Sequence, residues 1–157
     1  MRVALLFLAL VSAGLAQVAD RPSANSQQRT ALRLLATAAP DVQWDLSSLI
    51  RGDIACDGRS DQAYVGHAKS KIYVGLYRAR TGKAQILEFH VDGIHQDAIC
   101  RETAKLTVEA LDYDPDLDLR GYEKSKICKG LILSDGACDP LHFFWNHATS
   151  MMNWWRN

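Results

Sequence analysis

The clearest chemical pattern in the sequence is a short segment that carries several aspartates. Asp53, Asp57 and Asp61 are spaced so that their carboxylates could converge on one hard cation. Gly58 permits the sharp turn that such a loop needs. Ala55 occupies the position of a further ligand, and a cysteine lies in the middle of the loop. The segment is therefore interpreted either as a weak calcium site or as a loop that a disulfide holds in the metal's place.

Other polar residues give weaker candidates for a metal site or a catalytic site. Four aspartates alternate over residues 112–118, but Leu117 stands where an EF-hand loop requires glycine, which favours a solvated loop. Four histidines could act as metal ligands or as a general base, with Glu88 and Asp97 nearby in the sequence. They are His90, His95, His142 and His147. Neither H-E-x-x-H nor G-x-S-x-G occurs, so a catalytic role is less favoured than a structural one.

The C-terminal segment is rich in aromatic side chains that could form a contact surface. Alternate side chains of a strand point to opposite faces, so Phe143 and Trp145 should face one side and Phe144 the other. Trp154 and Trp155 are adjacent and should also face opposite sides. One face must build the core, and the other offers Phe144 and one tryptophan to a partner. The favoured alternative is that the N-terminal helix covers these aromatic residues.

A short N-terminal helix and a series of strands are expected to position these residues. Ser26 can cap a helix over residues 27–38, in which apolar residues recur on one face and which Pro40 ends. Short segments rich in Val, Ile, Tyr and Leu, separated by turn signals, predict strands. These strands cover residues 62–66, 71–77, 85–90, 105–111, 130–133, 141–145 and 151–155, with a long polar loop over residues 112–126. The predicted fold is α+β: a mostly antiparallel, twisted sheet of six or seven strands with one N-terminal helix and two disulfides.

The four cysteines are expected to form two disulfides, because their number is even and the chain carries an export signal. A zinc site would need close ligand pairs such as C-x-x-C, which the sequence lacks. A bridge between Cys128 and Cys138 would require a bend in the strand between them. This favours the pairs Cys56–Cys138 and Cys100–Cys128, although the order is left open.

The N-terminus has the layout of a secretory signal peptide. Arg2 is followed by an apolar run over residues 3–11 and then by small residues, which predicts a signal peptide over residues 1–16. The apolar run is shorter than the about 20 residues that span a bilayer, so no membrane insertion is expected after cleavage. Residues 17–26 are predicted to be a mobile leader. Residues 27–157 are predicted to form a single disulfide-stabilised domain that is periplasmic or secreted.

One pattern occurs twice in the chain. Residues 49–57 and residues 131–139 both read L-I-x-x-D-x-A-C-D, and each copy is followed by a strand-like segment and a hairpin. Identity at six of nine positions is compatible with chance and with a true internal repeat. A true repeat would place Cys56 and Cys138 in equivalent loops.

The aspartate segment resembles the Asp-rich loop of FG-GAP and VCBS-type repeats, which belong to extracellular β-propellers. Asp53, Asp57, Gly58 and Asp61 match the pattern D-x-[DN]-x-D-G-x-x-D, whereas Ala55 departs from it. The resemblance covers about one repeat. It implies calcium binding but not a propeller, because a propeller needs several blades.

Over most of residues 52–156 the chain also resembles a group of small, exported bacterial proteins of unknown function. The segments that carry this resemblance are Gly-Asp-x-x-Cys-Asp-Gly at 52–58, residues 96–100, 111–115, 128–131, 144–147 and 154–156. The resemblance implies an envelope location and no particular activity.

Taken together, these patterns predict an exported, non-catalytic binding module of the bacterial envelope, with inhibitor and immunity-type roles included. The predicted partner is a protein or a cell-wall glycan, and the predicted contact region comprises Phe144, Trp145, Trp155 and the loop 53–61. Basic and acidic residues balance at 18 each, which gives no electrostatic reason to expect nucleic-acid or membrane binding. The alternatives are an envelope hydrolase that uses His and carboxylate residues, and a structural domain stabilised by calcium. Apart from calcium, no cofactor is predicted.

Overall fold

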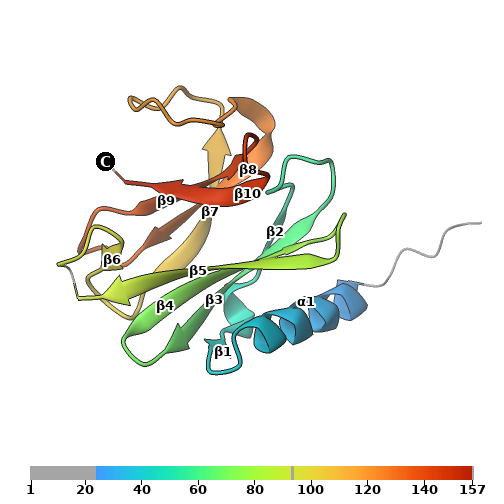
Figure 1. The fold of residues 1–157 in the computed structure, drawn as a ribbon, viewed down its shortest axis with the longest axis vertical. Coiled ribbons are helices and arrows are strands. Elements are labelled where there is room, and N and C mark those ends of the chain that lie inside the picture. The colour runs from blue at the N-terminus through green and yellow to red at the C-terminus, as the bar shows by residue number, and fades with distance from the viewer. Residues whose placement is uncertain (1–23, 93, 157) are drawn as a thin grey trace, which may run out of the picture.

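The computed structural model describes residues 24–92 and 94–156, whose arrangement is shown in Figure 1. The predicted signal peptide, residues 1–16, and the first part of the predicted leader, residues 17–23, lie outside the described residues. In the described part of the chain, no helix is long and apolar enough to cross a membrane.

The N-terminal helix is longer than the sequence predicts. Helix α1 (Ala24–Ala38) begins before the predicted Gln27, so Ser26 lies inside its first turns and is not the capping residue. The helix ends ahead of Pro40, because the proline ring disfavours helical backbone in the residue that precedes it.

The first sheet is built around the predicted three-stranded meander. Its elements are β1 (Gln43–Trp44), β2 (Ile50–Gly52), β3 (Asp61–Ala68), β4 (Lys71–Arg78), β5 (Lys83–Val91) and β6 (Ala98–Ile99), with the short helix η1 (Leu46–Ser48) between β1 and β2. Strands β3, β4 and β5 pair in antiparallel order, β1 and β2 both pair with the outer edge of β3, and β6 pairs with β5 in parallel.

The second sheet contains the remaining strands in the order β10-β9-β8-β7. They are β7 (Lys105–Leu111), β8 (Ser125–Ser134), β9 (Leu141–Asn146) and β10 (Met151–Trp155), and all pair in antiparallel fashion. The predicted fold class is confirmed: the described residues form an α+β protein with one helix, mostly antiparallel strands and two disulfides. The ten strands divide into two sheets, however, where the sequence predicted six or seven strands in one sheet.

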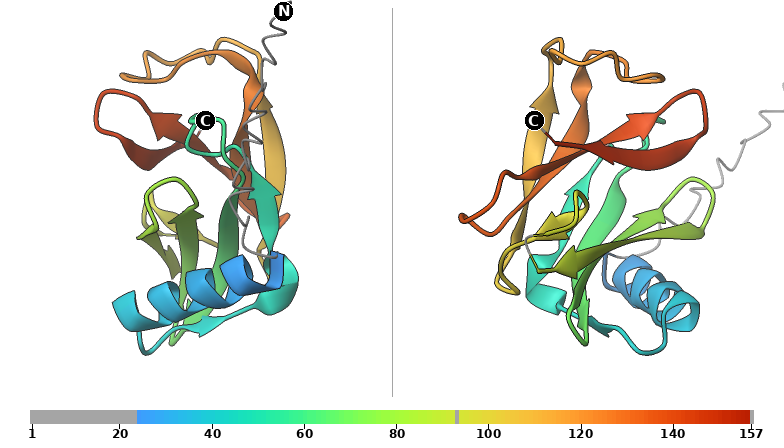
Figure 2. Two further views of the ribbon diagram at one scale, coloured as in Figure 1. Left: turned by 90° about the vertical axis from the view of Figure 1, so that its right-hand side faces the viewer. Right: turned by 60° about the vertical axis from the view of Figure 1, so that its left-hand side comes forward.

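The main core lies between the two sheets (Figures 1 and 2). Phe89 of the first sheet meets Phe143 of the second edge to face, with 5.5 Å between ring centroids. Trp154 contacts the same Phe89 ring at 5.8 Å. The side chain of Gln85 also links the sheets, because its amide exchanges hydrogen bonds of 2.7 and 2.8 Å with the backbone of Met152. The Gln85 side chain therefore bonds to β10 in the way that the backbone of a neighbouring strand would, and it connects the edges of β5 and β10.

Helix α1 packs on the outer face of the first sheet (Figure 2). Leu35 is fully buried there against Tyr64 and Trp44. A Cβ atom added to Gly75 would lie 2.7 Å from both the Leu35 side chain and the Trp44 ring. Glycine at this position lets the helix approach the sheet closely, which buries the apolar helix face.

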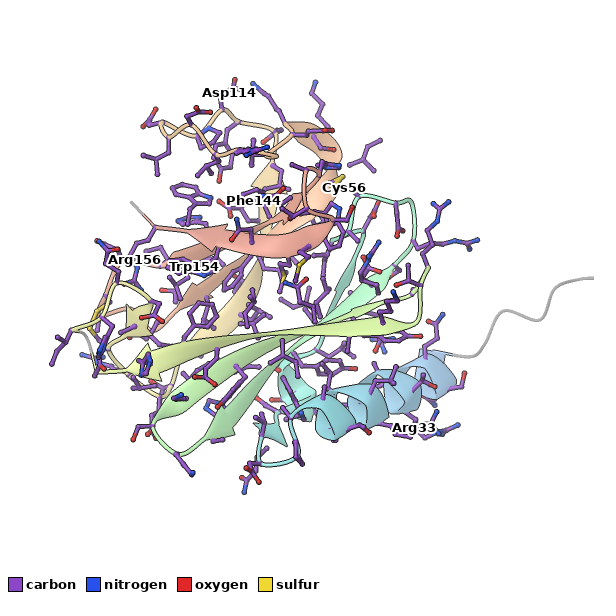
Figure 3. The ribbon with its side chains drawn as sticks, in the orientation of Figure 1. Arg33, Cys56, Asp114, Phe144, Trp154 and Arg156 are labelled. Carbon is purple, nitrogen blue, oxygen red and sulfur yellow. A yellow bond between two sulfur atoms is a disulfide. The ribbon has the colours of Figure 1, made fainter. Side chains whose placement is uncertain are left out.

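The outer face of the second sheet is covered by the segment 112–124, which connects β7 to β8. Tyr113 and Tyr122 of this segment pack against Phe144 and Trp155. In Figure 3, Phe144 lies beneath the loop that carries Asp114. The prediction that the N-terminal helix covers these aromatic residues is therefore wrong, because the helix lies on the other sheet.

The cysteines pair as Cys56–Cys128 and Cys100–Cys138, with Cα atoms 5.1 and 5.7 Å apart. The favoured pairing from the sequence, Cys56–Cys138 with Cys100–Cys128, is wrong. Strand β8 pairs with β9 only over residues 131–133, and before that stretch the Lys129 N–H donates a 3.0 Å hydrogen bond to the backbone carbonyl of Asp53, in the loop that carries Cys56. The loop that carries Cys138 lies beside Cys100 at the opposite end of β8.

Candidate functional site

The aspartate segment forms a folded loop between β2 and β3, and we call residues 53–60 the first loop. Asp53 accepts hydrogen bonds from the backbone N–H groups of Asp57 and Gly58, at 2.9 and 3.0 Å. Asp61, which is fully buried, accepts bonds from the N–H groups of Ala55 and Ala79, at 2.8 and 2.9 Å. Asp61 thus joins the first loop to the turn between β4 and β5.

Arg78 makes a second connection between the first loop and the rest of the protein. Its guanidinium stacks on the Trp145 ring at 4.3 Å, and one of its nitrogens lies 3.7 Å from Oδ2 of Asp57. Arg80 donates a hydrogen bond of 3.0 Å to the backbone carbonyl of Asp57. The first loop and the β4–β5 turn therefore form one braced unit, on the right in Figure 1.

The three predicted calcium ligands lie in this unit, but their oxygens already have partners. Both oxygens of Asp53, both of Asp61 and Oδ1 of Asp57 accept backbone N–H groups. The remaining oxygen, Oδ2 of Asp57, is buried, has no hydrogen-bond partner and faces Arg78. Burial raises the pKa of Asp61 above its ordinary value, although its two backbone hydrogen bonds act in the opposite direction. Calcium at Asp53, Asp57 and Asp61 stays a prediction.

The tip of the braced unit is positively charged. Arg59, Arg80 and Lys83 are exposed at the first loop and at the β4–β5 turn, and we call these three residues the basic end. None of the three takes part in an ion pair with another described residue, and the aspartates of the same unit are less exposed: Asp53 and Asp57 are half-buried and Asp61 is buried. The charges that this end exposes to solvent are therefore the positive ones, although acidic and basic residues balance over the whole chain.

The predicted aromatic contact region is not on the surface. Phe144, Trp145 and Trp155 retain only 2, 5 and 9% of their accessible surface. Trp145 faces the core between the sheets with Phe143, and Phe144 faces the segment 112–124, so the predicted alternation is confirmed. Because all three side chains are covered, they cannot present a stacking platform to a partner, and this part of the predicted contact region is corrected.

One of the four histidines meets a carboxylate inside the protein. Nδ1 of His142 lies 2.9 Å from Oε1 of Glu109, which also accepts a 2.7 Å hydrogen bond from the Tyr113 hydroxyl. The His142 ring stacks on Trp155 at 4.4 Å. Burial, followed by the bond to Glu109, raises the pKa of Tyr113 above its ordinary value. The cluster links β7, β9 and the segment 112–124, so its contacts hold the cover of the second sheet in place.

The other predicted histidines lie in three different surroundings. The rings of His90 and His95 stack at 4.8 Å, and Nδ1 of His95 lies 2.6 Å from a carboxylate oxygen of Asp92. His147 lies 3.8 Å from Glu123. Glu88 forms an ion pair with Lys71, so it does not serve a histidine as the sequence suggested.

Glu109, Tyr113 and Arg78 were not identified as site residues from the sequence. The sequence indicates on which face of its strand a residue such as Glu109 lies, but not which side chains it contacts. Glu109 sits on the outer face of β7, but its approach to His142 depends on how β7, β8 and β9 are aligned. That alignment is fixed by side-chain packing between the sheets and not by any motif within one strand. Arg78 follows the predicted strand 71–77, and nothing in the sequence around it indicates that it stacks on a tryptophan.

The fold and the braced unit define an α+β protein with two disulfides and, at one end, a loop that carries exposed basic residues and is attached by several contacts. No family model, no curated protein and no solved structure matches this chain. The inference of function therefore rests on the residues themselves.

Proposed function

We propose that this chain is an exported, non-catalytic binding module and that its basic end contacts an acidic surface of a protein partner, in the manner of an inhibitor or immunity-type protein. The observation that carries this proposal is the group Arg59, Arg80 and Lys83, which is exposed and lacks acidic partners within the described chain. Opposite charges across an interface accelerate association and align the partners.

The rigidity of the braced unit supports binding. The Cys56–Cys128 disulfide, the buried Asp61 and the stacked Arg78 each attach the loop or its neighbouring turn to the core. A loop that is already held in one conformation loses little conformational entropy when it binds. The charges at its tip are therefore presented in a defined arrangement before any partner arrives.

A protein partner is favoured over a cell-wall glycan. Sugar recognition commonly uses exposed aromatic rings, and the rings that could have served, Phe144, Trp145 and Trp155, are buried. What remains at the basic end is a protruding, charged loop, which suits an acidic protein surface. The two disulfides fit a protein that works outside the cytoplasm.

The proposal is tested with the processed chain immobilised and exposed to the envelope proteins of its own host, with intact sacculi in a parallel arm. Arg59→Glu/Arg80→Glu reverses two charges of the basic end. Lys105→Glu/Lys126→Glu makes the same change in charge at exposed positions of the second sheet and serves as the matched control. We expect a captured protein to be lost with the first variant, retained with the control and released by moderate salt, because screening weakens exposed charges.

For the captured protein, the charge reversal is expected to lower the association rate by about tenfold or more at low salt. Thermal unfolding of both variants confirms that they remain folded. A protein that binds both variants equally would overturn the proposal. Sacculi that bind the native chain and not Arg59→Glu/Arg80→Glu would reassign the partner to a glycan.

A further inference from the structure

Two histidines and an aspartate gather at the far end of β5 from the basic end. One ligand atom from each of His90, Asp92 and His95 lies within 4.8 Å of the other two. His90 is the penultimate residue of β5, and the other two follow in the connection to β6. Asp92 is exposed and His95 is 58% exposed at its side chain, so solvent ions reach the group freely.

The connection that carries this group is held in place by several bonds. Oδ1 of Asp92 accepts hydrogen bonds from the N–H groups of Ile94 and His95, at 2.8 and 3.3 Å. Arg156 donates from its guanidinium to the backbone carbonyls of Gln96 and Ala98. Figure 3 shows Arg156 beside β6, at the end of the molecule opposite the first loop. These bonds hold the backbone that carries the three side chains.

We propose that His90, Asp92 and His95 form a binding site for a divalent transition metal ion, with Zn²⁺ and Cu²⁺ as the ions that fit best. Imidazole nitrogen is a preferred ligand of both ions, and a single carboxylate completes a mixed set of three ligands. Calcium is disfavoured because it takes six to eight oxygen ligands. The site lies at the opposite end of β5 from the basic end, so the proposal of metal binding does not depend on the proposed partner binding.

Binding requires side-chain movements that the exposure of Asp92 and His95 allows. In a tetrahedral site with bonds of about 2.0–2.1 Å, ligand atoms stand about 3.3 Å apart, so the 2.6 Å contact between His95 and Asp92 would open slightly. The His95 ring would rotate out of its stack on His90, which its exposure permits. Oδ1 of Asp92 keeps its two backbone bonds while Oδ2 binds the ion. Three protein ligands leave one position open for water or for a group on another molecule.

The test is a calorimetric titration of Zn²⁺ into the processed, untagged chain, followed by Cu²⁺ binding observed by electron paramagnetic resonance. We expect one ion per chain and, for Cu²⁺, hyperfine structure from two imidazole nitrogens. His90→Ala, His95→Ala and Asp92→Asn should each weaken Zn²⁺ binding by about tenfold or more, since each removes one of three ligands. His147→Ala is the matched control, because that histidine lies near Glu123 in another part of the protein.

Circular dichroism and the melting temperature of each variant show whether it is folded. In case a variant does not fold, the histidine NMR signals of the unmodified chain provide an independent readout. Zn²⁺ should shift the signals of His90 and His95 and leave those of His142 and His147 in place. Absence of Zn²⁺ binding, or binding that survives His90→Ala and His95→Ala, would overturn the proposal.

Discussion

Two loops of this protein share one sequence pattern and can be compared directly. The first loop, residues 53–60, follows the end of β2 at Gly52, and the second loop, residues 135–140, follows the end of β8 at Ser134. Gly52 and Ser134 occupy the same place in the repeated pattern L-I-x-x-D-x-A-C-D. Each loop joins two antiparallel strands, and each carries a cysteine that is bonded to a distant segment.

The first aspartate of each copy ties its loop to the segment that carries the partner cysteine. The backbone carbonyl of Asp53 accepts a bond from Lys129, the residue after Cys128. In the second loop the carboxylate of Asp135 makes the connection, because it accepts hydrogen bonds of 2.6 and 2.7 Å from the N–H groups of Cys100 and Arg101. Each attachment therefore pairs a disulfide with a hydrogen bond next to it.

The loops differ in what they bury. Ile54 follows the first aspartate and is 1% exposed in the core, whereas Gly136 holds the equivalent position and is exposed with a φ of 70°. The last aspartate of the pattern, Asp57, faces Arg78, while Asp139 is exposed. The same sequence pattern can therefore attach a loop that contributes to the core or a turn on the surface. The two cases differ in the residue after the first aspartate, which is Ile54 in the first loop and Gly136 in the second.

The largest effects should come from removing the disulfides in pairs. Cys56→Ala/Cys128→Ala opens a loop of 72 residues and Cys100→Ala/Cys138→Ala one of 38. Chain entropy alone predicts losses of about 4.4 and about 3.9 kcal/mol. The first variant should lose more still, because Cys56 also packs against the core. Urea unfolding of both variants measures the difference. A second variant less stable than the first would show that the first loop is not the main anchor.

Removing the aspartate that holds each loop should have the next largest effect, and it should differ between Asp61, the residue of β3 that follows the first loop, and Asp135 of the second loop. Asp61→Ala leaves the N–H groups of Ala55 and Ala79 without an acceptor, and Ala55 is buried, so we expect a loss of about 2–4 kcal/mol. Asp135→Ala releases four backbone N–H groups, three of them on exposed residues where water can replace the carboxylate, so we expect about 1–2 kcal/mol. Equilibrium unfolding in urea gives both values. Equal losses would contradict the assignment of one loop to the core and the other to the surface.

Features that depend on a short stretch of sequence were predicted better than features that depend on contacts between distant segments. The alternation in residues 105–111 predicted β7 with its observed bounds, and alternation also predicted that Phe143 and Trp145 face the core, because side-chain direction has a period of two. The cysteine pairing was wrong because it depends on where β8 separates from β9, since the first loop bonds to β8 outside the paired residues 131–133. The packing of residues 112–124 over Phe144 was missed because their alternating aspartates favoured a solvated loop, whereas Tyr113, Leu119 and Tyr122 pack on the second sheet. Packing between distant segments leaves little trace in either segment alone.

The pH dependence of stability should carry opposite signs at Asp61, which holds the first loop, and at Asp135 of the second loop. The pKa of Asp61 is raised above 3.8 by burial, so its contribution to stability is complete below that value and declines as the pH rises through the folded pKa. At Asp135 desolvation acts to raise the pKa, but four backbone hydrogen bonds outweigh it and lower the pKa below 3.8. Its contribution is present above 3.8 and is lost as the pH falls through the folded pKa. Carboxyl ¹³C NMR titration measures both pKa values, and two values on the same side of 3.8 would contradict the contrast.

Calcium should give the smallest effect, and only at the first loop. To bind Asp53, Asp57 and Asp61 together, the ion would have to displace backbone N–H groups and the Arg78 guanidinium from the carboxylates. We therefore expect 1 mM calcium to stabilise the protein by no more than about 0.4 kcal/mol, the value for a dissociation constant near 1 mM. Thermal unfolding with calcium, with magnesium and with a chelator measures the shift. A larger rise that is specific for calcium and vanishes in Asp57→Ala would show that a cation site, and not only hydrogen bonding, shapes the first loop.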